Sequence, residues 1–65
     1  MQIFLNGKPL TVDDNISIDQ LLERLSLKGR LAIEINQNIL PRSKYHNYLI
    51  QANDTIEIIH AVGGG

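Results

Sequence analysis

The sequence predicts an α+β fold in which a mixed sheet of four or five strands packs one face against a single helix. The chain has 65 residues and no cysteine, so its 43% hydrophobic content must form one core without a disulfide or a thiolate metal cluster. Several short segments alternate apolar and polar residues, which is the period of a strand, and one segment repeats apolar residues at helical spacing.

The N-terminal part predicts a β-hairpin. Residues 1–5 alternate as a strand, and Asn6-Gly7 follows at once. This dipeptide favours a two-residue type I′ turn because both central residues of that turn need a positive φ. Residues 8–12 then form the return strand. Pro9 has no N–H to donate, so this strand is expected at an edge of the sheet.

An amphipathic helix of about ten residues is predicted next. Ser17 and Gln20 fit a capping box, in which each side chain satisfies a backbone donor of the first turn. Four apolar residues share one helical face, namely Ile18, Leu21, Leu22 and Leu25. Lys28-Gly29 supplies a cation and a left-handed stop near the expected end.

The second half of the chain predicts two more strands, residues 31–35 and 55–60, separated by an irregular segment. Residues 36–38 form a turn, and Pro41 begins a single helical turn over 41–45. The order is therefore strand, strand, helix, strand, irregular turn and strand. This order and the chain length indicate a β-grasp, or ubiquitin-like, domain over residues 1–62.

Three glycines, Gly63-Gly64-Gly65, close the chain, and we expect residues 63–65 to form a flexible tail. Glycine is about 7% of ordinary sequence, so three in a row arise by chance roughly once in three thousand triplets. Such a tail buries no apolar surface, and it can carry a terminal carboxylate into the active site of another protein. The alternative interpretation is a frayed end or a cloning remnant.

Charge and hydropathy exclude several classes of function. Six Lys and Arg against seven Asp and Glu, with a net charge of −1, do not provide the basic face that nucleic-acid binding requires. No apolar run approaches the roughly 20 residues of a membrane span, and the first residues lack the pattern of a secretory leader. We therefore expect a cytoplasmic protein that binds neither nucleic acid nor membrane.

Three segments resemble the sulfur carriers of thiamine biosynthesis, the ThiS family. They are residues 35–42, residues 53–58 and the closing Val62-Gly63-Gly64-Gly65, and the likeness covers nearly the whole chain. The chain differs from the common family pattern at residues 36–38, which read Asn-Gln-Asn in place of Asn-Gly-Glu, and at Tyr45, where tryptophan is frequent.

This resemblance implies a carrier and not an enzyme, with no bound cofactor. An adenylating enzyme related to the ubiquitin activators would transfer AMP from ATP to the carboxylate of Gly65. A sulfur donor protein would then convert the acyl-adenylate into a thiocarboxylate, and thiazole synthase would use its sulfur for the thiazole of thiamine. Val62, Gly63 and Gly64 would present the terminus to these partners.

The residues agree with this chemistry. An α-carboxyl group has a pKa of about 3.3–3.7, so at neutral pH Gly65 ends in a carboxylate that needs activation before a nucleophile attacks it. Because the chain has no cysteine, sulfur can be carried covalently only at the terminus.

No catalytic or metal-binding constellation is visible elsewhere in the sequence. His46 and His60 lack ligand spacing, and His60 is more typical of a strand residue near an interface. Asp13-Asp14 favours a solvated turn over a metal site. The basic residues Lys28, Arg30, Arg42 and Lys44 form a solvated rim or meet an acidic partner surface.

Alternation along the last strand predicts a docking surface. If Ile56 and Ile58 point toward the helix, Ile59 and Ala61 point away from it. Phe4 on the neighbouring first strand would face the same way, and an apolar patch would then lie beside the root of the tail. The alternative is that a loop covers this face.

Three other functions remain open at this point. The small subunit of molybdopterin synthase has the same fold and a Gly-Gly thiocarboxylate. A protein modifier would be conjugated to lysines through Gly65. A non-covalent interaction module of ubiquitin-like fold would have an inert tail.

Overall fold

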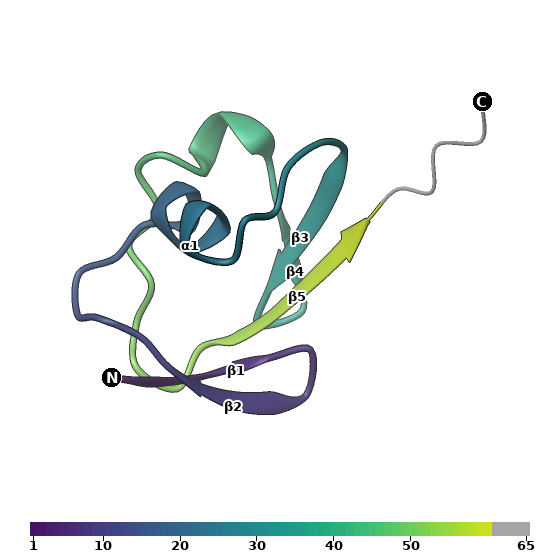
Figure 1. Cartoon of the computed structure of the whole chain (residues 1–65). Coiled ribbons are helices and arrows are strands. Elements are labelled where there is room, and N and C mark those ends of the chain that lie inside the picture. Colours follow the sequence, from purple (N-terminus) through teal and green to yellow (C-terminus); the bar gives the residue numbers. More distant parts are fainter. Residues whose placement is uncertain (61–65) are drawn as a thin grey trace.

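The computed structural model describes residues 1–60 of the chain as a five-stranded sheet packed against one helix (Figure 1). In chain order the elements are β1 (Gln2–Leu5), β2 (Lys8–Thr11), α1 (Ile18–Arg24), β3 (Leu31–Ile35), β4 (Asn38–Leu40), the 3-10 turn η1 (Arg42–Lys44) and β5 (Thr55–His60). The predicted α+β class is confirmed, and the strand count is the upper of the two expected.

The sheet is mixed, with the strand order β2-β1-β5-β3-β4. Only the central pair, β1 and β5, is parallel, and the other three pairs are antiparallel. Strand β2 lies at an edge, as Pro9 predicted. The last strand therefore occupies the middle of the sheet, where β1 lies on one side of it and β3 on the other.

Two tight turns have the backbone that their residues favour. Asn6 and Gly7 have φ values of 49° and 82°, so the β1–β2 connection has the two positive φ angles of a type I′ turn. Asn36 and Gln37, at 50° and 73°, join β3 to β4 in the same way. Gly7 is well suited to its position because it has no Cβ to oppose the left-handed backbone.

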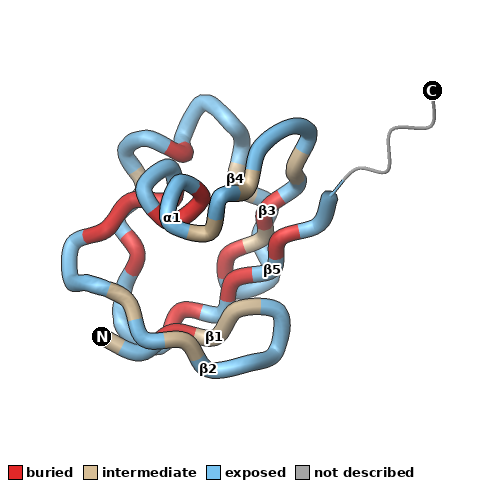
Figure 2. The backbone as a smooth tube through the Cα atoms, viewed as in Figure 1, coloured by how far each residue is buried: buried red, intermediate tan, exposed pale blue. Residues whose placement is uncertain are grey.

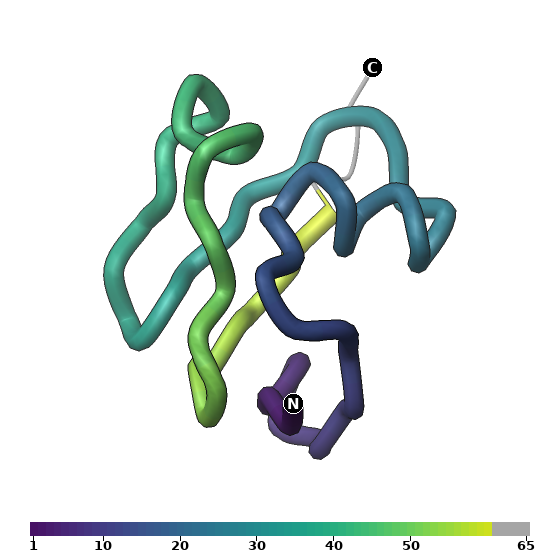
Figure 3. Tube along the Cα trace, turned by 90° about the vertical axis from the view of Figure 1, so that its left-hand side faces the viewer, coloured from purple at the N-terminus to yellow at the C-terminus, as the bar shows by residue number. Residues whose placement is uncertain are grey.

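The core lies between α1 and the facing side of the sheet (Figure 2). Apolar side chains alternate into it from the strands and repeat at helical spacing along α1. Six are almost completely inaccessible to solvent, namely Ile3, Ile18, Leu21, Ile33, Ile50 and Ile56. The segment between η1 and β5 runs along the molecule to the start of β5 and contributes Ile50 to the core (Figure 3).

The helix is shorter than predicted. It ends at Arg24, and Leu25 is its C-cap. Ser26 has a φ of 55°, its N–H donates to the carbonyl of Glu23, and the N–H of Leu27 donates to the carbonyl of Leu22. This is the Schellman arrangement, with a serine at the position that glycine usually takes. Expecting the stop at Lys28-Gly29 was wrong because the terminating bonds had already formed one turn earlier.

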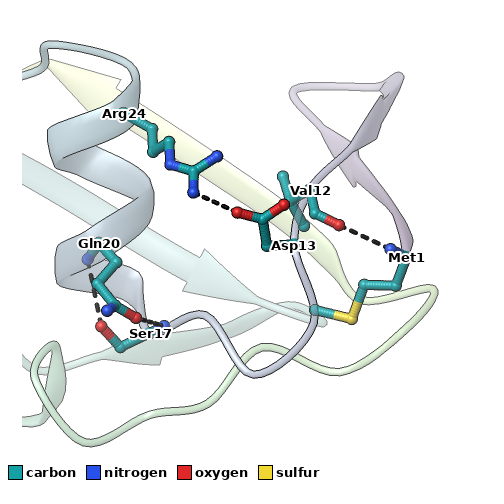
Figure 4. A network of polar contacts seen from close by, with 6 residues as sticks. All are labelled: Met1, Val12, Asp13, Ser17, Gln20 and Arg24. Atoms are coloured by element: carbon teal, nitrogen blue, oxygen red, sulfur yellow. Dashed lines mark hydrogen bonds and ion pairs between the residues drawn. The ribbon is translucent and has the colours of Figure 1, made fainter.

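The start of the helix matches the prediction. Ser17 Oγ accepts a hydrogen bond from the Gln20 N–H at 3.2 Å, and Gln20 Oε1 accepts one from the Ser17 N–H at 2.9 Å (Figure 4). Arg24 pairs with Asp13 in the preceding loop, so the same helix is tied to the β2 end of the sheet. The amino group of Met1 donates to the carbonyl of Val12 at 2.6 Å.

Candidate functional site

Strand β5 leads to the segment on which the predicted chemistry depends. Ile56 and Ile58 are buried, whereas the side chain of Ile59 is 54% exposed, so the expected alternation of this strand is confirmed. The description ends at His60. The remaining predicted site residues, Ala61, Val62, Gly63, Gly64 and Gly65, lie outside the described residues, and their roles stay predictions.

Asn6 fastens β5 on the side of β1. The backbone pairing of these strands covers Phe4 with Thr55 and Leu5 with Ile56, and β1 then turns away at the hairpin. At that point the Asn6 side chain continues the pairing, because its Oδ1 accepts from the Ile58 N–H at 2.9 Å and its Nδ2 lies 3.4 Å from the Ile58 carbonyl. A side-chain amide thus replaces a strand residue two positions before the end of β5.

A buried carboxylate fixes the other end of β5. Asp54 is 7% exposed, and its carboxylate accepts from the Tyr48 hydroxyl at 2.8 Å, the Asn36 amide at 3.0 Å and the Gln51 N–H at 2.9 Å. The Asn36 Oδ1 in turn accepts from the Thr55 N–H at 2.9 Å. Burial, together with the hydrogen bond and the negative charge of Asp54, raises the pKa of Tyr48 to about 12.

The bonds from Asn6 to Ile58 and from Asn36 to Thr55 hold β5 at a defined place in the sheet. Near its end β5 also pairs with β3, where Ile59 lies opposite Ala32 and His60 opposite Leu31. The strand that leads to residues 61–65 is therefore hydrogen-bonded on both of its sides. The sequence could indicate the turn-forming role of Asn6, but nothing in it indicated the bond to a strand 52 positions away.

The structure places Phe4 and Ile59 on one face but does not make them neighbours. Phe4 lies opposite Thr55, four residues before Ile59 along β5. At about 3.3 Å per residue this separates them by about 13 Å along the strand. Phe4 is also half-buried. The expectation of one apolar patch formed by Phe4 and Ile59 was therefore wrong. The two residues lie on one face of the sheet but at separate positions.

A residue not predicted to be exposed lies closer to Ile59 in the sheet. Ile39 on β4 is 78% exposed, the highest value among the large apolar side chains that are markedly exposed in the described part of the chain. It lies opposite Glu34, and Ala32 is the next residue of β3 on that face. Ile39 and Ile59 are thus two exposed apolar positions of this face, with Glu34 and Glu57 between them.

The other polar side chains considered from the sequence are exposed or ion-paired in the structure. His46 and His60 are exposed, and so are the basic residues Lys28, Arg30, Arg42 and Lys44. Asp13 pairs with Arg24. Within residues 1–60, no three His, Asp or Glu side chains come close enough to hold a metal ion, and no helix is long and apolar enough to cross a bilayer.

Comparison with known proteins decides the family. The model of the ThiS family matches residues 3–65, which is nearly the whole chain. This chain belongs to the ThiS family. The sulfur carrier protein ThiS of Bacillus subtilis is 38% identical over 63 residues, and the match covers 94% of this chain and 96% of that protein.

A solved structure and a longer protein are also similar to this chain. A crystal structure of the thiamine biosynthesis protein ThiS from Geobacter metallireducens has a TM-score of 0.86 and 29% identity, and covers all of both chains. The β-grasp fold is thereby confirmed. A thiazole synthase of Magnetococcus marinus is 33% identical over 66 aligned positions, which cover all of this chain and 20% of that protein.

Proposed function

We propose that this protein is a sulfur carrier for thiazole formation in thiamine biosynthesis, and that the carboxylate of Gly65 is the atom group that carries the sulfur. The main support is the family match, which runs through the glycines to residue 65. The fold agrees with it, because side-chain bonds hold β5 at Thr55 and at Ile58, and residues 61–65 follow this strand in the sequence.

The proposed reaction has two steps, both of which involve the carboxyl group of Gly65. The carboxylate of Gly65 attacks the α-phosphate of ATP, pyrophosphate leaves, and an acyl-adenylate forms. A sulfide equivalent from a sulfur donor protein then attacks the carbonyl carbon, and AMP leaves as the C–O bond breaks. The product is a thiocarboxylate. The partner enzymes supply the catalytic groups and bind the ATP, so this chain acts as a co-substrate without a bound cofactor.

The proposed partners are an adenylating enzyme related to the ubiquitin activators, a sulfur donor protein and thiazole synthase. The similarity to one fifth of a thiazole synthase supports the last of these, because a region like this chain is there part of the synthase itself. We place the reaction in the cytoplasm, where ATP is available to the adenylating enzyme.

We further propose that the carrier docks through the sheet face that carries Phe4 and Ile59, with Ala61 continuing the same alternation. The exposed Ile59 is the residue of this set nearest to the tail within the described chain. Ile59→Asp should weaken binding to the adenylating enzyme without unfolding the protein, because the side chain lies outside the core. Unchanged affinity of Ile59→Asp would show that the adenylating enzyme does not bind this face.

Growth rescue tests the pathway. Expression of the chain should restore growth of a thiazole auxotroph that lacks its own carrier, and it should not restore a strain that lacks the small subunit of molybdopterin synthase. The control is the same chain with one residue added after Gly65, which a carrier should not tolerate. Rescue by the extended chain would instead favour an interaction module with an inert tail.

A further inference from the structure

The sheet face opposite α1, here called the open face, carries acidic groups and no basic ones within the described residues. The strand registers place on it Gln2, Phe4, Pro9, Thr11, Ala32, Glu34, Ile39, Thr55, Glu57 and Ile59. The chain as a whole has nearly balanced charge, at six Lys and Arg against seven Asp and Glu. The described strand residues of the open face are therefore acidic in net charge, on a protein that is almost neutral.

The two acids of this face, here called the acidic pair, lie directly opposite each other. Glu34 of β3 is the register partner of Glu57 of β5. Directly opposed residues of an antiparallel pair have Cβ atoms about 4.5–5.5 Å apart, and like charges at that distance repel. The ion pairs formed between residues 1–60 involve other groups, Met1 with Asp14 and Arg24 with Asp13, so neither glutamate gains a cation from that part of the chain.

Exposed isoleucines border the acidic pair on two sides. Ile39 lies opposite Glu34 on β4, and Ile59 follows Glu57 as the next residue of β5 on the open face. These side chains are 78% and 54% exposed. A partner that covers them would exclude water from the carboxylates between them, which strengthens the attraction of these carboxylates for a cation.

We propose that the acidic pair receives an arginine or lysine side chain of the adenylating enzyme, while Ile39 and Ile59 form the apolar contacts around it. This inference rests on the proposed function, and it adds the chemistry of the partner surface. A guanidinium has donors on two edges, so one group can bond to both carboxylates. The repulsion between the glutamates in the free carrier would be relieved when the partner binds.

The charges also decide against a second copy of this chain as the occupant. A symmetric dimer through the open face would place the acidic pairs of both copies against each other. Four carboxylates would then lie close together, and no described strand residue of either open face is basic. A partner of opposite charge fits this surface, and a copy of the same chain does not.

The test is the double variant Glu34→Gln, Glu57→Gln, compared with Asp19→Asn, Glu23→Gln. Both change the net charge by the same amount, but Asp19 and Glu23 are exposed acids of α1, away from the open face. Affinity for the purified cognate adenylating enzyme is measured by calorimetry at about 0.15 M salt, where charges more than about 8 Å apart are largely screened.

The proposal predicts opposite effects on stability and on binding. The open-face variant should bind about tenfold more weakly, whereas its thermal midpoint should equal or exceed that of the wild type because the repulsion is gone. The α1 variant should keep its affinity within about twofold. The difference in affinity between the wild type and the open-face variant should become smaller as salt is raised, because salt screens the attraction that only the wild type has.

Each remaining result overturns one specific statement. Equal affinity of the open-face variant and the wild type would refute the basic partner group. A concentration-dependent dimer of the wild type that disappears in Ile39→Asp would show that a second copy occupies the face. Failure of the wild type itself to bind the adenylating enzyme would refute the proposed function, and this outcome is distinct from the first.

Discussion

The hydrogen bond from Asn6 to Ile58 allows us to predict how much the free energy of unfolding falls when Asn6 is replaced. The expected loss has two parts, the hydrogen bond and the backbone strain. Asn6→Ala removes the acceptor of the Ile58 N–H, which costs about 1 kcal/mol for an ordinary hydrogen bond. It also places alanine at a φ of 49°, which costs about 1 kcal/mol more because its Cβ opposes the left-handed backbone. We therefore expect Asn6→Ala to lower the free energy of unfolding by about 2 kcal/mol.

Two variants separate the bond from the backbone strain. Asn6→Gly loses the bond but accepts the positive φ, so about 1 kcal/mol is expected. Asn15 has a φ of 60°, and its side chain makes no hydrogen bond to another described residue, so Asn15→Ala should show the strain of about 1 kcal/mol alone. Urea denaturation followed by circular dichroism gives all three values.

Hydrogen exchange provides the local readout. In Asn6→Gly the amide of Ile58 should exchange about fivefold faster after correction for global stability, which corresponds to the lost bond. The opposite result would be that Asn6→Ala costs no more than Asn15→Ala and that the exchange at Ile58 is unchanged. The Asn6 side chain would then contribute nothing to holding the strand that precedes the tail.

Two other predictions concern the pKa of Tyr48 and the N-terminal cap of α1. Because the folded-state pKa of Tyr48 is raised from 10.0 to about 12, stability is fully present below pH 10 and is lost as the pH rises toward 12. Solvent screens the half-buried ring, so we expect a loss of about 1 kcal/mol, and urea midpoints of Tyr48→Phe should lack this alkaline decline. Ser17→Ala should cost about 1 kcal/mol by removing the cap of α1, which a thermal midpoint about 4–8 °C lower would report. An unchanged midpoint would show that the capping box is dispensable.

Local chemistry was enough to predict much of this fold. Asn6-Gly7 predicted the hairpin, Pro9 predicted an edge strand, and the alternation of residues 55–60 predicted which side of β5 is buried. Each of these depends on the dihedral preference or the period of a few adjacent residues. Such features do not require knowledge of which segment lies next to which.

The parts that were missed depend on contacts between distant segments. The offset of Phe4 from Ile59 is fixed by the register of β1 on β5, and no local residue pattern encodes that register. Ile39 was not recognised as exposed because a three-residue strand is too short for its alternation to be read. The early end of the helix depends on Ser26 in a left-handed conformation, which is rarer for serine than for the glycine expected three positions later.

The residues of the candidate site divide in the same way. Sequence reasoning placed Ile59 on the correct face, and the structure added Glu34, Glu57 and Ile39 around it. The acidic pair was missed because its members lie 23 positions apart in the chain and meet only through the β3–β5 register. The roles of Gly65 and its neighbours remain predictions, because these residues lie outside the described part of the chain.

The most direct test of the central claim is the intact mass of the carrier after incubation with ATP, its adenylating enzyme and a sulfur source. We expect a mass increase equal to the exchange of one oxygen for sulfur, located by fragmentation at Gly65 and absent without ATP. A chain with one residue added after Gly65 serves as the control and should keep its mass. An unchanged mass in the complete reaction, or a sulfur atom at any other position, would show that the carboxylate of Gly65 does not carry the sulfur.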